Sequence, residues 1–89
     1  MDTNEIQNKV NEIISEKFED TVRDALVYEY ENGEIMIDVN AWTEDVSSGK
    51  FFECDFGVAA KKFGIDVSSV GTGDGDGVRI FIFKVLEVA

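Results

Sequence analysis

The sequence predicts an α+β fold of two layers, in which helices cover one face of an antiparallel sheet. Three observations predict it: a helical repeat of apolar residues over 2–20, a hairpin pattern over 25–41, and an apolar strand over 78–88. The expected order is N-terminal helix, three-strand antiparallel meander, short helix and final strand (αβββαβ). The 89 residues suit one small domain, so we expect a single acidic α+β domain over residues 1–89.

The N-terminal segment 2–20 has the pattern of an amphipathic helix. Its apolar residues recur at helical spacing and form one stripe: Ile6, Val10, Ile13, Ile14 and Phe18. Asp2 is expected to cap the first turn, with Glu5 three residues later. On the opposite side, four glutamates fall within about 60° of one another at about 100° per residue: Glu5, Glu12, Glu16 and Glu19. This row is either a contact surface for a partner or an ordinary solvated helix face.

Segment 25–41 carries the strongest hairpin signal in the chain, Asn32-Gly33, because a type I′ turn needs positive φ at both central residues. A two-residue turn places Tyr30 opposite Ile35 and predicts one buried face. That face contains Leu26, Tyr28, Tyr30, Ile35, Ile37 and Val39. The opposite face would be acidic and contain Val27, Glu29, Glu31, Glu34, Met36 and Asp38, with Phe81 or Phe83 as a further apolar contact.

Beyond the hairpin the alternation of apolar residues changes phase at Trp42. A β-bulge near Ala41-Trp42 would return Trp42 to the core side, and we expect that bulge. Without it, Trp42 joins Met36 on the acidic face. Ser47-Ser48-Gly49 suits a three-residue loop with Gly49 in the left-handed region, so the third strand is predicted over 50–54, with Cys54 buried.

The last third of the chain predicts a helix, a loop and a strand. Asp55 is a suitable cap for a helix over 56–63, with two lysines in its last turn and Gly64 just past its end. A longer helix from Phe51 also fits the spacing. We expect a loop over 65–77, and then the strand 78–88, whose middle is apolar on both faces. Such a strand is covered on both sides, or its second face binds a partner.

The charge narrows the classes of partner. Nineteen Asp and Glu against eight Lys and Arg give a net charge of −11, which disfavours contact with nucleic-acid phosphates or anionic membranes. The chain has no signal peptide pattern and no apolar run of about 20 residues. It has one cysteine, which is typical of a reducing compartment. We therefore expect a cytoplasmic protein that contacts neither membrane nor nucleic acid directly.

The residue types also limit the chemistry. The chain has no histidine, which excludes a histidine base, a Cys-His nucleophile and a histidine-ligated zinc. Asp74 to Gly77 fits the D-x-D-G core of a calcium loop. However, this alignment puts Thr72 and Phe83 where the loop needs Asp and a bidentate Glu. The same segment does not suit phosphate, because its aspartates repel anions and a strand follows it. We expect no catalytic residue, no metal and no cofactor.

These observations together predict a small acidic, non-catalytic binding or inhibitor protein that engages a basic surface on a larger protein. One form is a phage-type nucleic-acid mimic, because the helix glutamates are spaced roughly 4.5–10.5 Å along the axis, comparable with strand phosphates. Another is an immunity protein that blocks a cationic toxin. The predicted contacts are Glu29, Glu31, Glu34, Met36, Asp38, Glu5, Glu12, Glu16 and Glu19. We expect a monomer. The alternatives are acidity that serves solubility alone, or an assembly subunit with Phe81, Phe83 and Val85 as its dimer face.

Overall fold

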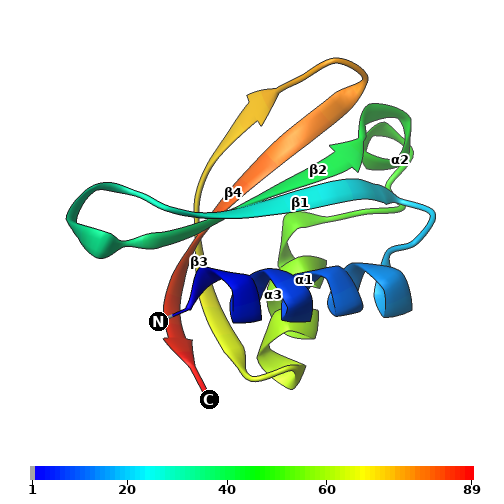
Figure 1. Cartoon of the computed structure of the whole chain (residues 1–89). Helices are drawn as coiled ribbons and strands as arrows, with labels where there is room; N and C mark the ends of the chain where they lie inside the picture. Colours follow the sequence, from blue (N-terminus) through cyan, green and yellow to red (C-terminus); the bar gives the residue numbers. More distant parts are fainter. Residues whose placement is uncertain (1) are drawn as a thin grey trace.

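The computed structural model describes residues 2–89 and has the predicted two-layer α+β fold. The elements in order are α1 (Thr3–Lys17), β1 (Val22–Glu29), the 3-10 turn η1 (Glu31–Gly33), β2 (Ile35–Trp42), α2 (Thr43–Ser47), α3 (Glu53–Lys62), β3 (Ile65–Asp74) and β4 (Val78–Val88). The strands form one antiparallel sheet in the order β1-β2-β4-β3. Figure 1 shows α1 and α3 on one face of this sheet and α2 at the end of β2.

The middle of the chain differs from the predicted order of elements. The third strand predicted over 50–54 is wrong: α2 precedes this segment and α3 begins within it. The Asp55 carboxylate accepts a hydrogen bond from Phe52 N at 3.0 Å, so α3 starts at Glu53, between the two predicted starts. Its last turn contains Lys61 and Lys62, and Gly64 follows with φ of 81°, as predicted.

The predicted loop over 65–77 is also wrong, because residues 65–74 form the edge strand β3. Its sequence, IDVSSVGTGD, mixes four β-branched residues with four Ser and Gly residues, which are unfavourable in strands. An extra residue in β3, Val70, lies between Ser69 and Gly71 and further breaks the alternation that would identify the strand, whereas the register shift at Asp66 and Val67 places its extra residue, Leu86, in β4. Residues 75–77 alone connect β3 to β4.

The core lies between the sheet and the helices α1 and α3. The predicted apolar stripe of α1 faces this core, and the helix ends at Lys17 with Phe18 as its C-cap. Phenylalanine rings join the layers, with centroids 5.0 Å apart for Phe56 and Phe83 and 5.5 Å apart for Phe51 and Phe81. The buried residues of the core cluster are Ile6, Val10, Ile13, Val22, Val27, Ile35, Ile37, Val39, Ala41, Phe51, Phe56, Ala59, Ala60, Ile65, Phe81, Phe83 and Val85.

β4 occupies the central position that its sequence predicted, between β2 and β3. Phe81, Phe83 and Val85 point to the helices and are buried. These three side chains are therefore core residues. They neither join the predicted acidic face nor form an exposed dimer face.

The register of the hairpin differs by one residue from the prediction. Asn32 and Gly33 both have positive φ, 63° and 77°, as predicted. However, the Tyr30 N–H donates to the Glu34 carbonyl at 2.6 Å, so three residues form the loop. Val27 then lies opposite Ile37. Because side chains alternate along a strand, this shift turns β1 over while β2 keeps its predicted faces.

Trp42 is not returned to the core, so the bulge predicted near Ala41-Trp42 is wrong. Ala41 fills the core position and is fully buried, whereas Trp42 keeps 37% of its surface exposed on the other face. The irregularity lies instead in β1, between Val22 and Asp24. The Arg23 guanidinium lies over the Trp42 ring, 5.8 Å from its centroid.

Candidate protein-binding surface

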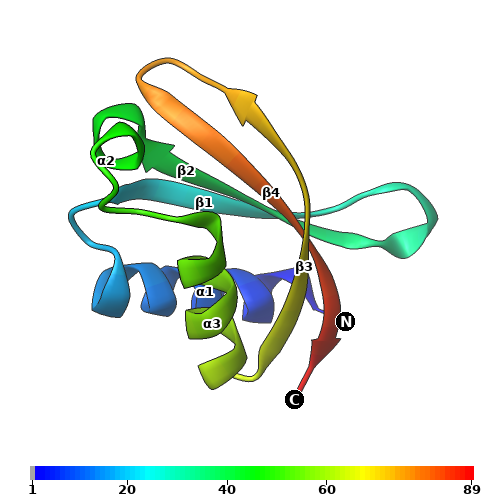
Figure 2. The same ribbon diagram turned by 180° about the vertical axis from the view of Figure 1, so that it is seen from behind.

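The face of the sheet that points away from α1 and α3 has no covering helix in the described part of the chain (Figures 1 and 2). Its members follow from the strand register, because residues directly opposite each other on neighbouring strands share a face. We call it the open face. It comprises Asp24, Leu26 and Tyr28 of β1 with the adjoining Tyr30, Met36, Asp38, Asn40 and Trp42 of β2, Val78, Ile80, Ile82, Lys84 and Leu86 of β4, and Ser68, Gly71 and Gly73 of the edge strand β3.

The open face is mainly apolar and aromatic. Leu26 and Tyr30 each keep 56% of their surface exposed, and Leu86 keeps 53%. Ile80 and Ile82, which flank the polar side chains of β2, are half-buried. Aromatic and long apolar side chains are the residues that contribute most to protein–protein binding energy. The open face therefore has the composition of a contact surface.

Short polar interactions cross the open face between β2 and its neighbours. The Tyr28 hydroxyl donates to Asp38 Oδ1 at 3.0 Å, and Lys84 Nζ lies 2.7 Å from Glu34 Oε2. Asn40 Nδ2 donates to Asp24 Oδ1 at 2.6 Å. Burial raises the pKa of Tyr28, and the bond to Asp38 and the charge of Asp38 raise it further. These contacts fix the side chains in place before any partner binds.

The predicted acidic face of the hairpin does not exist as one surface. Glu29 lies opposite Ile35, so it belongs to the helix side at the end of the hairpin. Glu31 lies in the turn, and Glu34 is paired with Lys84. Of the predicted hairpin contacts, Met36 and Asp38 lie on the open face, and Glu34 borders it through its bond to Lys84. The physical reason is the three-residue loop, which reverses the faces of β1 relative to those of β2.

The glutamates of the N-terminal segment lie on another side of the molecule. Glu5, Glu12 and Glu16 are exposed on α1, which packs on the opposite face of the sheet from the open face. Glu19 follows the C-cap Phe18 and lies outside the helix, so the predicted row has three helical members. The structure therefore does not bring the helix glutamates together with Asp38 and Met36.

The apolar members of the open face were missed as a site by sequence reasoning. Leu26, Tyr28 and Tyr30 were assigned to the core, although each lies on the open face. A usable signal was present in β4, whose middle is apolar on both faces. With its odd-numbered side chains buried against the helices, Ile80 and Ile82 must face the other way.

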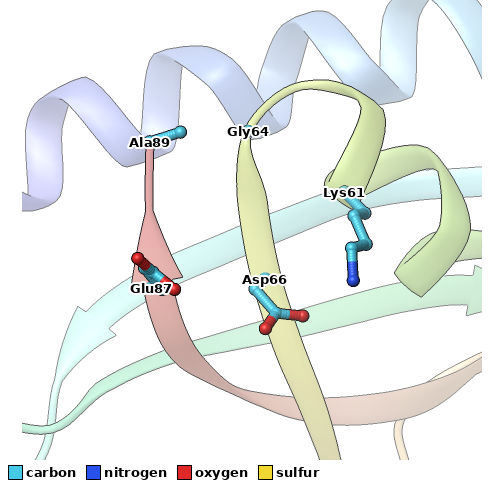
Figure 3. A pocket seen from close by; sticks show the side chains of 5 residues that line it. All are labelled: Lys61, Gly64, Asp66, Glu87 and Ala89. Carbon is cyan, nitrogen blue, oxygen red and sulfur yellow. The ribbon is translucent and has the colours of Figure 1, made fainter.

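Another feature of the surface is a weaker candidate for a binding site. A shallow hollow of about 270 Å³ lies where the ends of β3 and β4 meet, and Figure 3 shows the side chains that line it. They are Lys61, Gly64, Asp66, Glu87 and Ala89. Lys61 forms no ion pair with either carboxylate among residues 2–89. This hollow combines one cation with two anions and has no apolar anchor, so it is a weaker candidate than the open face.

Cys54 is exposed on α3, so its predicted burial in a strand is wrong.

Asp74, from the rejected calcium alignment, lies 3.6 Å from the Arg79 guanidinium. Within residues 2–89, no group of three or more Cys, Asp or Glu side chains is placed to hold a metal ion. Nor does this part of the chain contain a helix with the length and apolar character needed to cross a membrane.

Comparisons with protein-family models, curated proteins and solved structures find no match to this chain.

Proposed function

We propose that this chain is a small, non-catalytic binding protein that docks through its open face on a basic surface of a larger protein. The observation that carries the proposal is an apolar and aromatic sheet face with no covering layer in the described residues. Contiguous exposed patches of this kind are uncommon on monomeric proteins and mark interaction sites. The open face supplies the apolar contact, and the charge of the chain indicates the kind of partner.

The net charge of −11 favours a basic partner over a second copy of the chain. A symmetric dimer would bring together two equally acidic chains and place the same patch of each against the other. Acidic side chains also lie at both ends of the open face, alongside the cations Lys84, which pairs with Glu34, and Arg23, which lies over Trp42. Glu31 and Glu34 are at the hairpin turn. Glu44 and Asp45 are on α2, whose first residue, Thr43, donates its backbone N–H to the carbonyl oxygen of Gly77 in the β3–β4 turn at 3.1 Å. Such a border steers a basic surface toward the apolar centre.

The edges of the sheet are less suited to binding than its face. β1 is an edge strand, but the Gln7 side chain occupies the hydrogen-bonding groups of Ala25 and Val27. β3 is the other edge, and its bulge at Val70 disrupts the regular spacing that an added strand needs. Docking through the open face therefore fits the molecule better than addition of a partner strand.

The geometry also ranks the specific forms of this function. A nucleic-acid mimic would use the glutamates of α1 and leave the open face unused, because the two lie on opposite sides of the sheet. An inhibitor or immunity protein that contacts a cationic toxin or a nucleic-acid-binding enzyme needs apolar and acidic groups together. The open face and its acidic ends combine both, so we favour a protein-type contact of this kind.

A matched pair of variants tests the proposal. Leu26 on the open face and Val58 on α3 are almost equally exposed, 56% and 59%, so Leu26→Ser and Val58→Ser remove comparable apolar surface from opposite sides. The immobilised chain is used to capture proteins from a lysate of the source cells, and each variant is compared with the wild type. We expect Leu26→Ser to lose the captured partner and Val58→Ser to keep it. Equal capture by both variants, or loss by Val58→Ser alone, would contradict the proposal.

Salt and competition experiments then characterise the partner. Capture should weaken as salt rises, because exposed charges are screened beyond about 8 Å at physiological ionic strength. If the captured protein binds nucleic acid through the same basic surface, duplex DNA or RNA will displace it. If it is a cationic toxin, its toxicity will be lost in the complex. If the amount of captured protein does not change with salt concentration, the acidity of the chain serves solubility alone.

A further inference from the structure

Asp38 occupies the centre of the open face. It lies directly between Leu26 of β1 and Ile82 of β4, with Met36 next to it on the same face of β2. The side chain is half-buried, and Tyr28 donates a hydrogen bond to its Oδ1 at 3.0 Å. A partner that covers Leu26 and Ile82 must therefore also cover the carboxylate of Asp38.

The charge of Asp38 is not paired within the described residues. The three ion pairs of residues 2–89 are Arg23–Asp24, Arg79–Asp74 and Lys84–Glu34. The cation nearest in the register, Lys84, lies opposite Met36 and is engaged by Glu34. Tyr28 contributes a neutral donor, and Oδ2 of Asp38 accepts no hydrogen bond from residues 2–89.

An apolar partner surface alone would therefore be a poor match for the open face. Removing water from an ionised carboxylate is unfavourable unless a cation or several donors replace it. The partner must supply such a group at the position of Asp38. The ring of Tyr28 favours a guanidinium over an ammonium, because Tyr28 bonds to Asp38 and lies edge-on to Tyr30, with ring centroids 6.5 Å apart. A guanidinium can pair with a carboxylate and stack on an aromatic ring at the same time.

We propose that Asp38 receives an arginine side chain of the bound protein, with the aliphatic part of that arginine lying between Leu26 and Ile82. This inference rests on the proposed function, since it identifies the group that the partner places at the centre of the open face. It assigns Asp38 a role in specificity: the apolar residues supply contact area, and Asp38 selects partners that carry an arginine within an apolar patch.

The test uses defined peptides. The ¹⁵N-labelled chain is titrated with acetyl-Leu-Arg-Leu-amide and with the same peptide containing citrulline, which keeps the shape of arginine but carries no charge. Amide shifts of Leu26, Asp38 and Ile82 report binding at the open face. We expect the arginine peptide to bind at least about tenfold more tightly than the citrulline peptide, because hydrogen bonds between charged groups are stronger than neutral ones.

Two variants separate Asp38 from general acidity. In Asp38→Asn the side-chain oxygen still accepts the Tyr28 hydroxyl, so the fold is kept while the charge is lost; the arginine preference should disappear. Glu12→Gln makes the same charge change on exposed α1 and should leave the preference intact. The inference is overturned if Asp38→Asn retains the preference, or if Glu12→Gln reduces it equally.

The outcomes also distinguish the inference from the proposed function. If both peptides shift Leu26 and Ile82 with equal affinity, the open face binds apolar peptides and the role of Asp38 is wrong. If neither peptide shifts the open face, or if shifts scatter over carboxylates throughout the molecule, both claims fail.

Discussion

The Gln7 side-chain amide hydrogen bonds to the backbone of Val27 and its neighbour Ala25, as a strand paired with β1 would. Gln7 Oε1 accepts the Val27 N–H at 2.8 Å, and Gln7 Nε2 donates to the Ala25 carbonyl at 3.0 Å. A second donor bond from Nε2 to Asn11 Oδ1, also 3.0 Å, holds the amide in this orientation. One residue of α1 thus satisfies two backbone groups on the free edge of the sheet.

Replacing Gln7 with leucine should destabilise the protein. The substitution leaves one N–H and one C=O of β1 without their partners. Because each hydrogen bond contributes about 0.5–1.5 kcal/mol net, the free energy of unfolding should fall by about 1–3 kcal/mol. Urea denaturation measures it. Asn8→Ala, one position along the exposed side of α1, is the control and should change stability by less than about 0.5 kcal/mol. A Gln7→Leu protein as stable as the wild type would show that the amide does not hold the edge.

Tyr28 should ionise at higher pH than an ordinary tyrosine, because burial and then Asp38 raise its pKa. Its folded pKa exceeds its unfolded value of about 10. Its contribution to stability is therefore complete below pH 10 and is lost as pH rises through the folded pKa. Tyrosinate absorbance in a Tyr30→Phe background isolates this titration, since the chain has two tyrosines. The Asp38→Asn substitution should lower the pKa of Tyr28. The pKa should still exceed that of an ordinary tyrosine, because burial continues to raise it. An unchanged titration in Asp38→Asn would mean that the two side chains are uncoupled.

The chain should be monomeric at micromolar concentration. Phe81, Phe83 and Val85 are buried within it, and the charge of −11 opposes contact between two open faces. Light scattering should give the mass of one chain, 9.9 kDa, at both low and moderate salt. A stable dimer that Ile82→Glu dissociates would show instead that the open face binds a second copy.

Replacing a buried or an exposed phenylalanine with alanine should have sharply different effects on the free energy of unfolding. Phe83 is 2% exposed and packs against Phe56, whereas Phe52 is 57% exposed. Phe83→Ala removes a buried ring and should cost about 3–5 kcal/mol, a large part of the stability of a small domain. Phe52→Ala should cost far less. Thermal or urea unfolding of the two variants provides the comparison, and similar losses would mean that the core is not centred on β4.

Patterns that depend on one element alone were predictable from sequence. The stripe of Ile6, Val10 and Ile13 identifies α1, and the apolar run of β4 identifies a central strand. Their periodicity reports local geometry and burial together. The α+β class follows from these two elements and the hairpin.

Features that depend on the relation between elements were not predictable. The Asn32-Gly33 pair correctly indicates positive φ at both residues, but it does not determine whether Tyr30 pairs with Glu34 or with Ile35. That single choice decides which side of β1 faces the helices, and so whether Leu26 belongs to the core or to the open face. β3 was missed because this edge strand has a bulge at Val70 and mixes Ser and Gly with its β-branched residues, so it lacks the alternation of a half-buried strand.

Docking through the open face is tested by side-chain footprinting of the complex with the captured partner. Oxidative labelling of exposed side chains is compared in the free and bound protein. We expect Leu26, Tyr30 and Trp42 on the open face to become protected, while Phe52 and Val58, which are exposed away from that face, stay reactive. Protection confined to Phe52, Val58 or the α1 surface, with the open face still reactive, would contradict docking through the open face.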